Sequence, residues 1–453
     1  MSFIPDTEAE ALSALFSRRS VLGATAAGGL LATPLAAFAQ SGAASGPGEA
    51  EITVDQARQE PIPIVVPNFG AGLGEQISGV ITSDLNGTGL FKVMSGSVPP
   101  GSTPDFSALK AQGARAAVAG QAVGAGSVRV EMRLWDVLSG QQLQGTAYTA
   151  SNSNWRRIAH IIADVIYERM LGEKGYFDTR IAYIARTGPR HHQITRLALM
   201  DQDGANERML TGGEWLTLTP RFNPVRDQIA FMSYANNRPR VYLFDLASGR
   251  QQILGEFAGI SFAPRFSPTG GSVVLSATRG GGSDIFVVDL ASRAKRQITN
   301  SNGAIDTSPC FSPDGSQIVF NSDRGGSPQL YIMSASGGGA KRISYGSGQY
   351  GSPVWSPRGD LIAFTRIGSG GFSLGVMNPD GTGERILTQG FTVDGATFCP
   401  NGRVLAFCRQ SASGAGGAGF ASGIGTIDIT GFNERPIRIS TDASDPAWSP
   451  RNG

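Results

Sequence analysis

The sequence predicts an α+β N-terminal domain followed by a six-bladed, all-β propeller that the C-terminal strand closes. Three observations support this prediction. A short hairpin, with the turn Ser-Pro-Asp-Gly at residues 312–315, recurs through the second part of the chain. Each copy belongs to a unit of four short strands, which is typical of a propeller blade. The last strand of the chain has no blade of its own, and the first blade lacks this strand.

The repeats are marked by a proline at each hairpin turn, and successive prolines are 43 to 50 residues apart. A large aromatic residue stands two positions before each proline: Phe222, Phe266, Phe311, Trp355, Phe398 and Trp448. Proline in the second turn position and glycine in the fourth suit a type I turn. An apolar strand follows each turn except the last, and two further strands complete each unit.

The strand count predicts how the ring closes. There are six strands of the first type (strand A), and six of the second type (strand B) if residues 180–186 are counted. The first strand B has no strand A before it, and the last strand A, at residues 446–449, has no strand B after it. Pairing these two would leave the ring without an open sheet edge.

The region before the propeller predicts a small mixed domain over residues 50–175, with the propeller over residues 176–453. Residues 75–85 fit a helix, and residues 115–123 and 128–137 alternate as strands do. Isoleucines at helical spacing between Ile158 and Ile166 predict a second helix, which Gly172 would end.

Residues 1–39 have the order of a secretory signal peptide. Arg18 and Arg19 precede a short apolar run and an Ala-x-Ala site, so we expect cleavage between Ala39 and Gln40. The paired arginines leave open whether export follows the twin-arginine or the Sec route. The run is too short, and too interrupted by Pro34, for a membrane anchor. Residues 40–49, rich in Gly, Ser and Ala, predict a flexible leader.

No catalytic, cofactor or metal site is expected. Residues 371–375 fit G-x-S-x-G, but they lead into a strand, and the three histidines (His160, His191 and His192) all lie upstream. The glycines at 70–74 lack the third glycine of a dinucleotide-binding loop. His191 and His192 would point to opposite faces of a strand and have no third ligand.

The net charge and the cysteine content indicate no special class of partner and no disulfide framework. A net charge of +2 gives no reason to expect nucleic acid or an anionic membrane as a partner. The three cysteines, Cys310, Cys399 and Cys408, are expected to be small buried thiols. We therefore expect a monomeric exported binding protein with no direct membrane insertion.

The order of signal peptide, α+β domain and six blades resembles the TolB family of the Tol-Pal system in Gram-negative bacteria. The residues around the domain junction, at 154–186, and the terminal Pro-Ala-Trp-Ser-Pro motif carry the resemblance. It implies a non-enzymatic periplasmic adaptor without cofactors. Such an adaptor binds the lipoprotein Pal through the propeller and TolA through its N-terminus, with other envelope proteins as further possible partners. The role implied is to maintain the outer membrane and to draw it inward during cell division.

The resemblance also implies partner-binding residues. Ala263 and Thr307, expected just before two A strands, match family positions at the Pal-facing mouth of the propeller, and Ile260 stands where the family has a histidine. The TolA-binding segment would be the strand at Glu51, Ile52, Thr53 and Val54, which would add to a sheet edge of its partner. The alternatives are an exported scaffold outside the Tol-Pal system and a propeller hydrolase with an unrecognised site.

Overall fold

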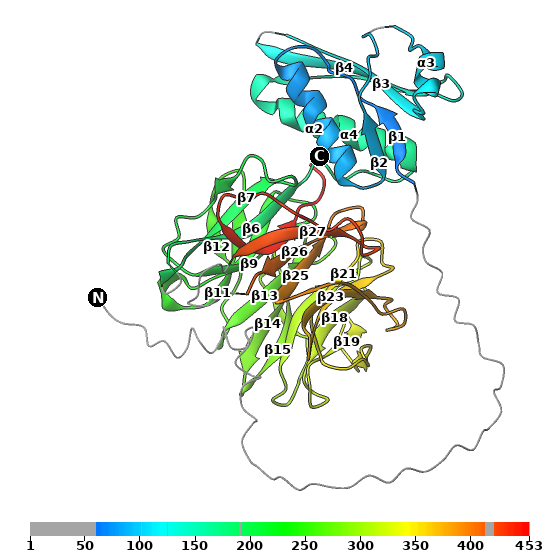
Figure 1. Ribbon diagram of the computed structural model, residues 1–453. Coiled ribbons are helices and arrows are strands. Elements are labelled where there is room, and N and C mark those ends of the chain that lie inside the picture. The colour runs from blue at the N-terminus through cyan, green and yellow to red at the C-terminus, as the bar shows by residue number, and fades with distance from the viewer. Residues whose placement is uncertain (1–59, 101, 125, 190–191, 413–420, 453) are drawn as a thin grey trace, which may run out of the picture. The chain divides into compact units, whose positions relative to one another are not determined.

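The computed structural model describes residues 60–452 apart from 101, 125, 190–191 and 413–420. The predicted signal peptide with its Ala39–Gln40 cleavage site, the leader and the segment Glu51–Val54 lie outside the described residues. The chain from Gln59 onward forms one compact unit, whose ribbon Figure 1 shows.

The N-terminal domain is built on a five-stranded mixed sheet in the order β2-β1-β3-β4-β5. β1 runs parallel to β2 and β3, whereas β3, β4 and β5 form an antiparallel meander. The strands are β1 (Ile62–Val65), β2 (Phe91–Met94), β3 (Ala116–Val123), β4 (Ser127–Asp136) and β5 (Gln142–Ser151). The domain therefore has the mixed architecture predicted from the sequence.

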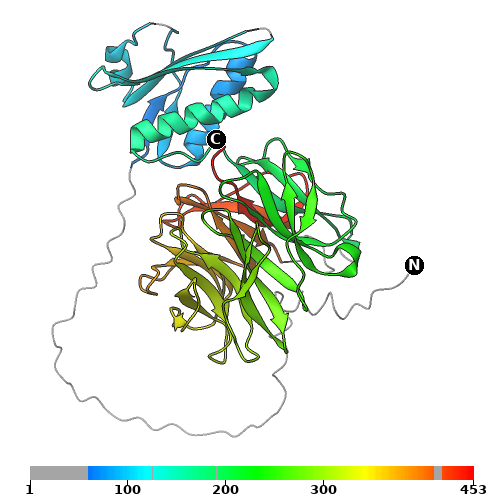
Figure 2. The same ribbon diagram turned by 180° about the vertical axis from the view of Figure 1, so that it is seen from behind.

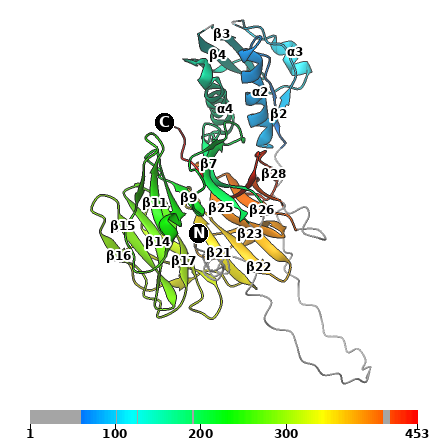
Figure 3. The same ribbon diagram turned by 90° about the vertical axis from the view of Figure 1, so that its left-hand side faces the viewer.

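Two helices, α2 (Leu73–Gly87) and α4 (Trp155–Leu171), pack against each other and against this sheet (Figure 3). α4 is seen along its length in Figure 2. It buries three of the four isoleucines expected from the sequence, at 158, 162 and 166, while Ile161 is half-buried. It ends at Gly172, whose φ of 76° suits a residue without a Cβ. A short helix, α3 (Phe106–Ala111), and a 3-10 turn, η2 (Asn152–Asn154), complete the domain.

The propeller contains six four-stranded antiparallel blades, as predicted. In each blade the strand named first is innermost. Blade 1 consists of β29 (Asp442–Trp448), β6 (Arg180–Thr187), β7 (Ile194–Asp201) and β8 (Arg208–Met209). Blade 2 consists of β9 (Thr217–Phe222), β10 (Gln228–Ser233), β11 (Arg240–Asp245) and β12 (Gln251–Ile253), with a 3-10 turn, η4 (Ala235–Asn237), between β10 and β11. Blade 3 consists of β13 (Ser261–Phe266), β14 (Ser272–Arg279), β15 (Gly282–Asp289) and β16 (Lys295–Gln297).

The remaining blades repeat the pattern. Blade 4 consists of β17 (Asp306–Phe311), β18 (Gln317–Ser322), β19 (Gln329–Ser334) and β20 (Lys341–Arg342). Blade 5 consists of β21 (Gln349–Trp355), β22 (Ile362–Gly368), β23 (Gly371–Met377) and β24 (Arg385–Gly390). Blade 6 consists of β25 (Thr392–Phe398), β26 (Val404–Gln410), β27 (Ser422–Asp428) and β28 (Arg435–Pro436). Each innermost strand contacts the next around the ring.

The C-terminal strand closes the ring in the way the strand count predicts. β29 pairs antiparallel with β6, and Trp448 stands opposite Ile181. The Trp448 indole Nε1 donates a hydrogen bond of 2.8 Å to Thr179 Oγ1, and Ser449 N donates one of 2.8 Å to the Arg180 carbonyl. Residues from the two ends of the propeller sequence thus share one sheet.

Every innermost strand contains a β-bulge at the same place. The pairing with the second strand shifts register there in all six blades. The bulge residue has a positive φ, between 47° and 69°, and the six residues are Thr219, Ala263, Ser308, Ser352, Gly395 and Asp445. Five of the six are not glycine, so the packing of the ring imposes a backbone conformation that such residues rarely adopt.

Candidate functional site

The predicted mouth residues lie on two neighbouring blades. Ala263 is the bulge residue of β13, and Thr307 precedes the bulge residue of β17. These two innermost strands contact each other. Ala263 and Thr307 lie inside the strands and not just before them, because the strands begin three and two residues earlier than the sequence suggested. Ile260 lies immediately before β13. Its backbone N–H donates a hydrogen bond of 2.8 Å to Thr278 Oγ1, and its carbonyl accepts one of 2.9 Å from Thr278 N.

Buried polar groups with unused hydrogen-bonding capacity gather near Thr307. Its Oγ1 is buried without a partner among the described residues. The neighbouring Asp306 is fully buried; one carboxylate oxygen pairs with Arg324 at 2.7 Å, while the other has no partner there. Since buried polar atoms are normally satisfied, these two atoms depart from the usual pattern in a part of blade 4 that is shielded from the surface.

The motifs that were tested as catalytic in the sequence lie at positions where they serve the fold. Ser373 of the G-x-S-x-G match lies within β23, paired with Arg366, and not on a strand-to-helix turn. Gly72 precedes the first residue of α2. Cys310, Cys399 and Cys408 are free and buried, as expected.

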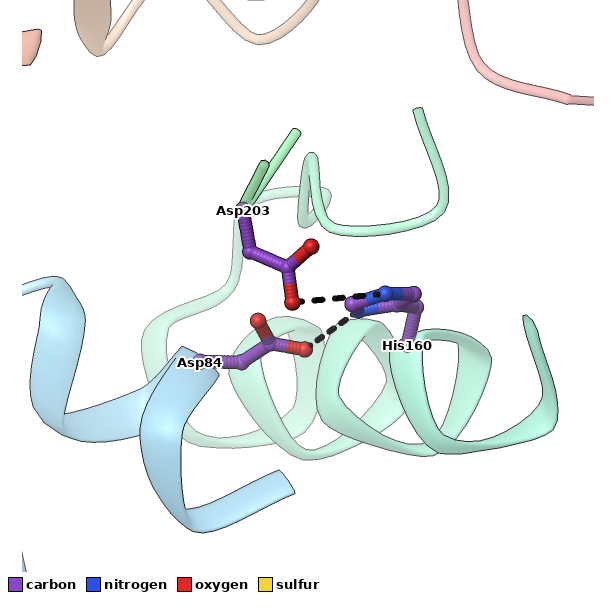
Figure 4. Close-up of side chains that lie close together, drawn as sticks. All are labelled: Asp84, His160 and Asp203. Atoms are coloured by element: carbon purple, nitrogen blue, oxygen red, sulfur yellow. Dashed lines mark hydrogen bonds and ion pairs between the residues drawn. The ribbon is translucent and has the colours of Figure 1, made fainter. Parts of the chain in front are cut away.

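A buried charged cluster joins the N-terminal domain to the first blade. His160 of α4 hydrogen-bonds through Nδ1 to Asp84 of α2 at 2.6 Å, and its Nε2 faces Asp203 at 3.9 Å (Figure 4). Gln202 donates a hydrogen bond of 2.9 Å to the other oxygen of Asp84. Arg156, one helical turn before His160, pairs with Asp203. Two helices are therefore connected to the turn after β7 through charged and polar groups.

The surroundings of His160 favour its charged form. Burial alone lowers the pKa of His160, but Asp84, Asp203 and Asp201 outweigh that effect and raise it to about 9. Burial raises the pKa of Asp84, while the charge of His160 and its hydrogen bond counteract that rise. With His160 and Asp84 only 3% and 2% exposed, the two groups form an ion pair shielded from water.

The three side chains could in principle ligate a cation, since their donor atoms lie within 4.8 Å of one another. The observed contacts favour an ion-pair network instead. Nδ1 of His160 is occupied by Asp84, and Asp203 already binds the Arg156 guanidinium. A cation at Nε2 would lie beside this guanidinium and be repelled by it.

A cavity of about 600 Å³ opens next to this cluster. It is lined by the N-terminal end of α4, the start of β6 and residues near the C-terminus. Five arginines are among the lining residues: Arg156, Arg157, Arg180, Arg226 and Arg451. Carboxylates balance part of this charge: Arg157 lies 3.2 Å from Asp178, and Arg180 lies 3.0 Å from Asp227.

The buried ion pair of His160 was not predicted from the sequence, although the position of His160 in the helical pattern indicated a buried polar side chain. His160 lies on the buried face of α4, in register with Ala163 and Tyr167, and Asp84 lies on the buried face of α2. A polar residue at such a position normally needs a buried partner. Which partner it finds depends on how the two helices and the propeller pack.

Comparison with known proteins decides the family. A protein-family model described as "TolB beta propeller domain" matches residues 167–452. A second model, described as "TolB amino-terminal domain", matches residues 50–143. The chain belongs to the TolB family. It is 99% identical over 453 residues, the full length of both chains, to "Tol-Pal system protein TolB" of Gluconobacter oxydans (strain 621H). As a TolB-family protein it is a component of the Tol-Pal system. Membership of that system implies that it interacts with other Tol-Pal components.

A solved relative confirms the architecture of this TolB-family chain. The crystal structure of TolB from Acinetobacter baumannii is 28% identical, with a TM-score of 0.75. The match covers 86% of this chain and 97% of that one, so both domains are included. Within the described part of the chain, none of the helices has the length and apolar character that crossing a membrane requires.

Proposed function

We propose that this chain is a non-enzymatic adaptor of the periplasm, which binds Pal through its propeller and TolA through its N-terminal segment. In this role it supports outer-membrane integrity and the inward movement of the envelope during division. The observation that carries the proposal is the match to the TolB family over both domains. The signal-like order of residues 1–39 supports export with cleavage after Ala39. We further propose that the mature protein is a monomer.

The propeller supplies a suitable face for Pal. Ile260, Ala263 and Thr307 lie where the connections between blades enter the innermost strands, and the turns of the Ser-Pro-Asp-Gly type lie at the other ends of those strands. A rigid ring needs little reorganisation when a partner binds, which favours affinity.

Isothermal titration of the protein with the soluble domain of Pal tests this face. We expect saturable one-to-one binding. The substitution Ala263→Trp, or Ile260→Glu, should weaken it at least about tenfold by steric exclusion or by burial of an unpaired charge. The control is Thr269→Trp, an exposed residue in the turn at the opposite end of β13. The proposal is wrong if the folded protein does not bind Pal, and the face is wrong if the control weakens binding as much.

Removal of the segment 51–54 tests the TolA contact separately. A variant lacking these residues should lose binding to the periplasmic domain of TolA, because the backbone hydrogen bonds of an added strand would be absent. Its affinity for Pal should remain measurable, which shows that the propeller is intact. Retained TolA binding would place the contact elsewhere.

A further inference from the structure

Two arginines occupy equivalent positions on neighbouring innermost strands of the propeller. Arg221 on β9 and Arg265 on β13 each lie two residues after the bulge residue and one before the large aromatic. The other four blades carry uncharged residues at this position: Cys310, Val354, Thr397 and Ala447. The repeat therefore does not require a positive charge here.

The Arg221 side chain lies near the centre of the ring. Its electrostatic neighbours are Arg265, Asp445, Cys310 and Asp394, which belong to four other blades. Strands of that many blades come together only at the axis, where the innermost strands contact one another in sequence. Both arginines are half-buried, so solvent still reaches them.

The two guanidinium groups have no carboxylate partner. Within the described part of the chain, neither lies within ion-pair distance of an acidic group. Arg221 donates a hydrogen bond of 2.6 Å to the carbonyl of Pro220 in its own strand. No side-chain hydrogen bond joins Arg265 to another described residue.

The carboxylates whose charges act on Arg221 are hydrogen-bonded to other groups. Asp394 accepts hydrogen bonds from Thr365 Oγ1 at 2.7 Å and from Gly395 N at 2.6 Å. Asp445 accepts one of 2.7 Å from Ser444 Oγ. The two arginines therefore remain without a direct counter-ion inside the protein.

The surroundings of Arg221 and Arg265 disfavour the charged form of both side chains. Burial, and then the charge of Arg265, lowers the pKa of Arg221 to about 9. Burial also lowers the pKa of Arg265. Two like charges in a partly desolvated space repel each other, and an anion placed between them would offset both the repulsion and the lost hydration.

We propose that Arg221 and Arg265 form a binding site for a small oxyanion, carrying a phosphate or carboxylate group, inside the propeller ring. The planar guanidinium group matches both oxyanions with paired hydrogen bonds. This inference does not depend on the binding of Pal or TolA.

Calorimetric titration of the full-length protein with sodium phosphate, and separately with sodium acetate, tests the site. Sodium chloride keeps the ionic strength constant, so that general screening is the same throughout. We expect saturable binding of one anion per chain. Arg221→Gln and Arg265→Gln should each raise the dissociation constant at least about tenfold. Arg250→Gln, an exposed arginine of the same blade as Arg221, should leave it unchanged.

Thermal melting separates a binding role from a structural one. Without phosphate or acetate, Arg265→Gln should melt at the same temperature as the wild type or higher, because one repelling charge is gone. Added phosphate should raise the melting temperature of the wild type alone. If Arg221→Gln does not fold, Arg265→Gln carries the test.

Three outcomes would overturn the proposal. The first is no saturable binding of either anion by the folded protein up to about 10 mM. The second is unchanged binding in the folded glutamine variants. The third is a lower melting temperature for Arg265→Gln in the anion-free buffer, which would show that the arginine stabilises the empty ring. Binding of only one of the two anions supports the site and identifies the group that it prefers.

Discussion

Replacement of Trp448 by alanine should destabilise the protein by about 3–5 kcal/mol, as for other large buried aromatic side chains. Trp448 is 6% exposed, its indole Nε1 donates to Thr179 Oγ1 at 2.8 Å, and its ring lies 5.8 Å from that of Tyr176. The variant would lose packing volume and leave a buried hydroxyl with one partner fewer. Because the residue lies in β29, the loss falls on the strand pair that closes the ring.

Urea unfolding followed by fluorescence and by circular dichroism measures this effect. Trp215→Ala is the matched control, since Trp215 is 39% exposed and its removal should change the free energy of unfolding by less than about 0.5 kcal/mol. A free energy of unfolding for the Trp448 variant within about 1 kcal/mol of the wild type would contradict the importance assigned to ring closure.

Replacement of His160 by alanine should cost about 3–5 kcal/mol at pH 6, because it leaves Asp84 buried without its cationic partner. The effect should depend on pH in a defined direction. The pKa of His160 in the folded protein, about 9, lies above the ordinary value of 6.5. Its protonation therefore stabilises the folded state fully below pH 6.5, and this contribution is lost as the pH rises through 9.

Denaturant titrations at pH 6 and near pH 10 check this prediction. The difference in the free energy of unfolding between the wild type and His160→Ala should shrink strongly at the higher pH. His192→Ala is the control, because His192 is exposed. A difference of the same size at both values would mean that His160 contributes by packing and not by charge. Asp84, Asp201, Asp203 and Arg156 are the charged groups that face it.

The propeller could be predicted from the sequence in detail because each blade repeats the same local information. The aromatic before the turn proline, the turn itself and the apolar second strand recur six times, so an ambiguous copy is corrected by the others. The N-terminal domain has no such redundancy. β5 was missed because it alternates between exposed and half-buried residues and has no apolar face to identify it. β2 and α3 are only 4 and 6 residues long.

The site features that escaped prediction depend on distances between residues far apart in the chain. Asp84, His160 and Asp203 meet only when two helices and a propeller turn have packed. The β-bulges of the innermost strands could not be predicted for another reason. Residues before proline usually adopt extended backbone conformations, yet Ala263 has a φ of 50° before Pro264. The geometry of the assembled ring overrides that local preference.

The closure of the ring by β29 has a consequence for the order of folding. The bond from Trp448 to Thr179 joins residues 269 positions apart, so the first blade cannot be completed until the end of the chain is available. Contacts over such separations are slow to form, because the entropy of closing a long loop must be overcome first. We therefore expect blades 2 to 6 to acquire their hairpins early, while β6 keeps an unpaired edge until the C-terminus arrives. The ring of blades therefore stays open at the edge of β6 until the last strand of the chain has been made.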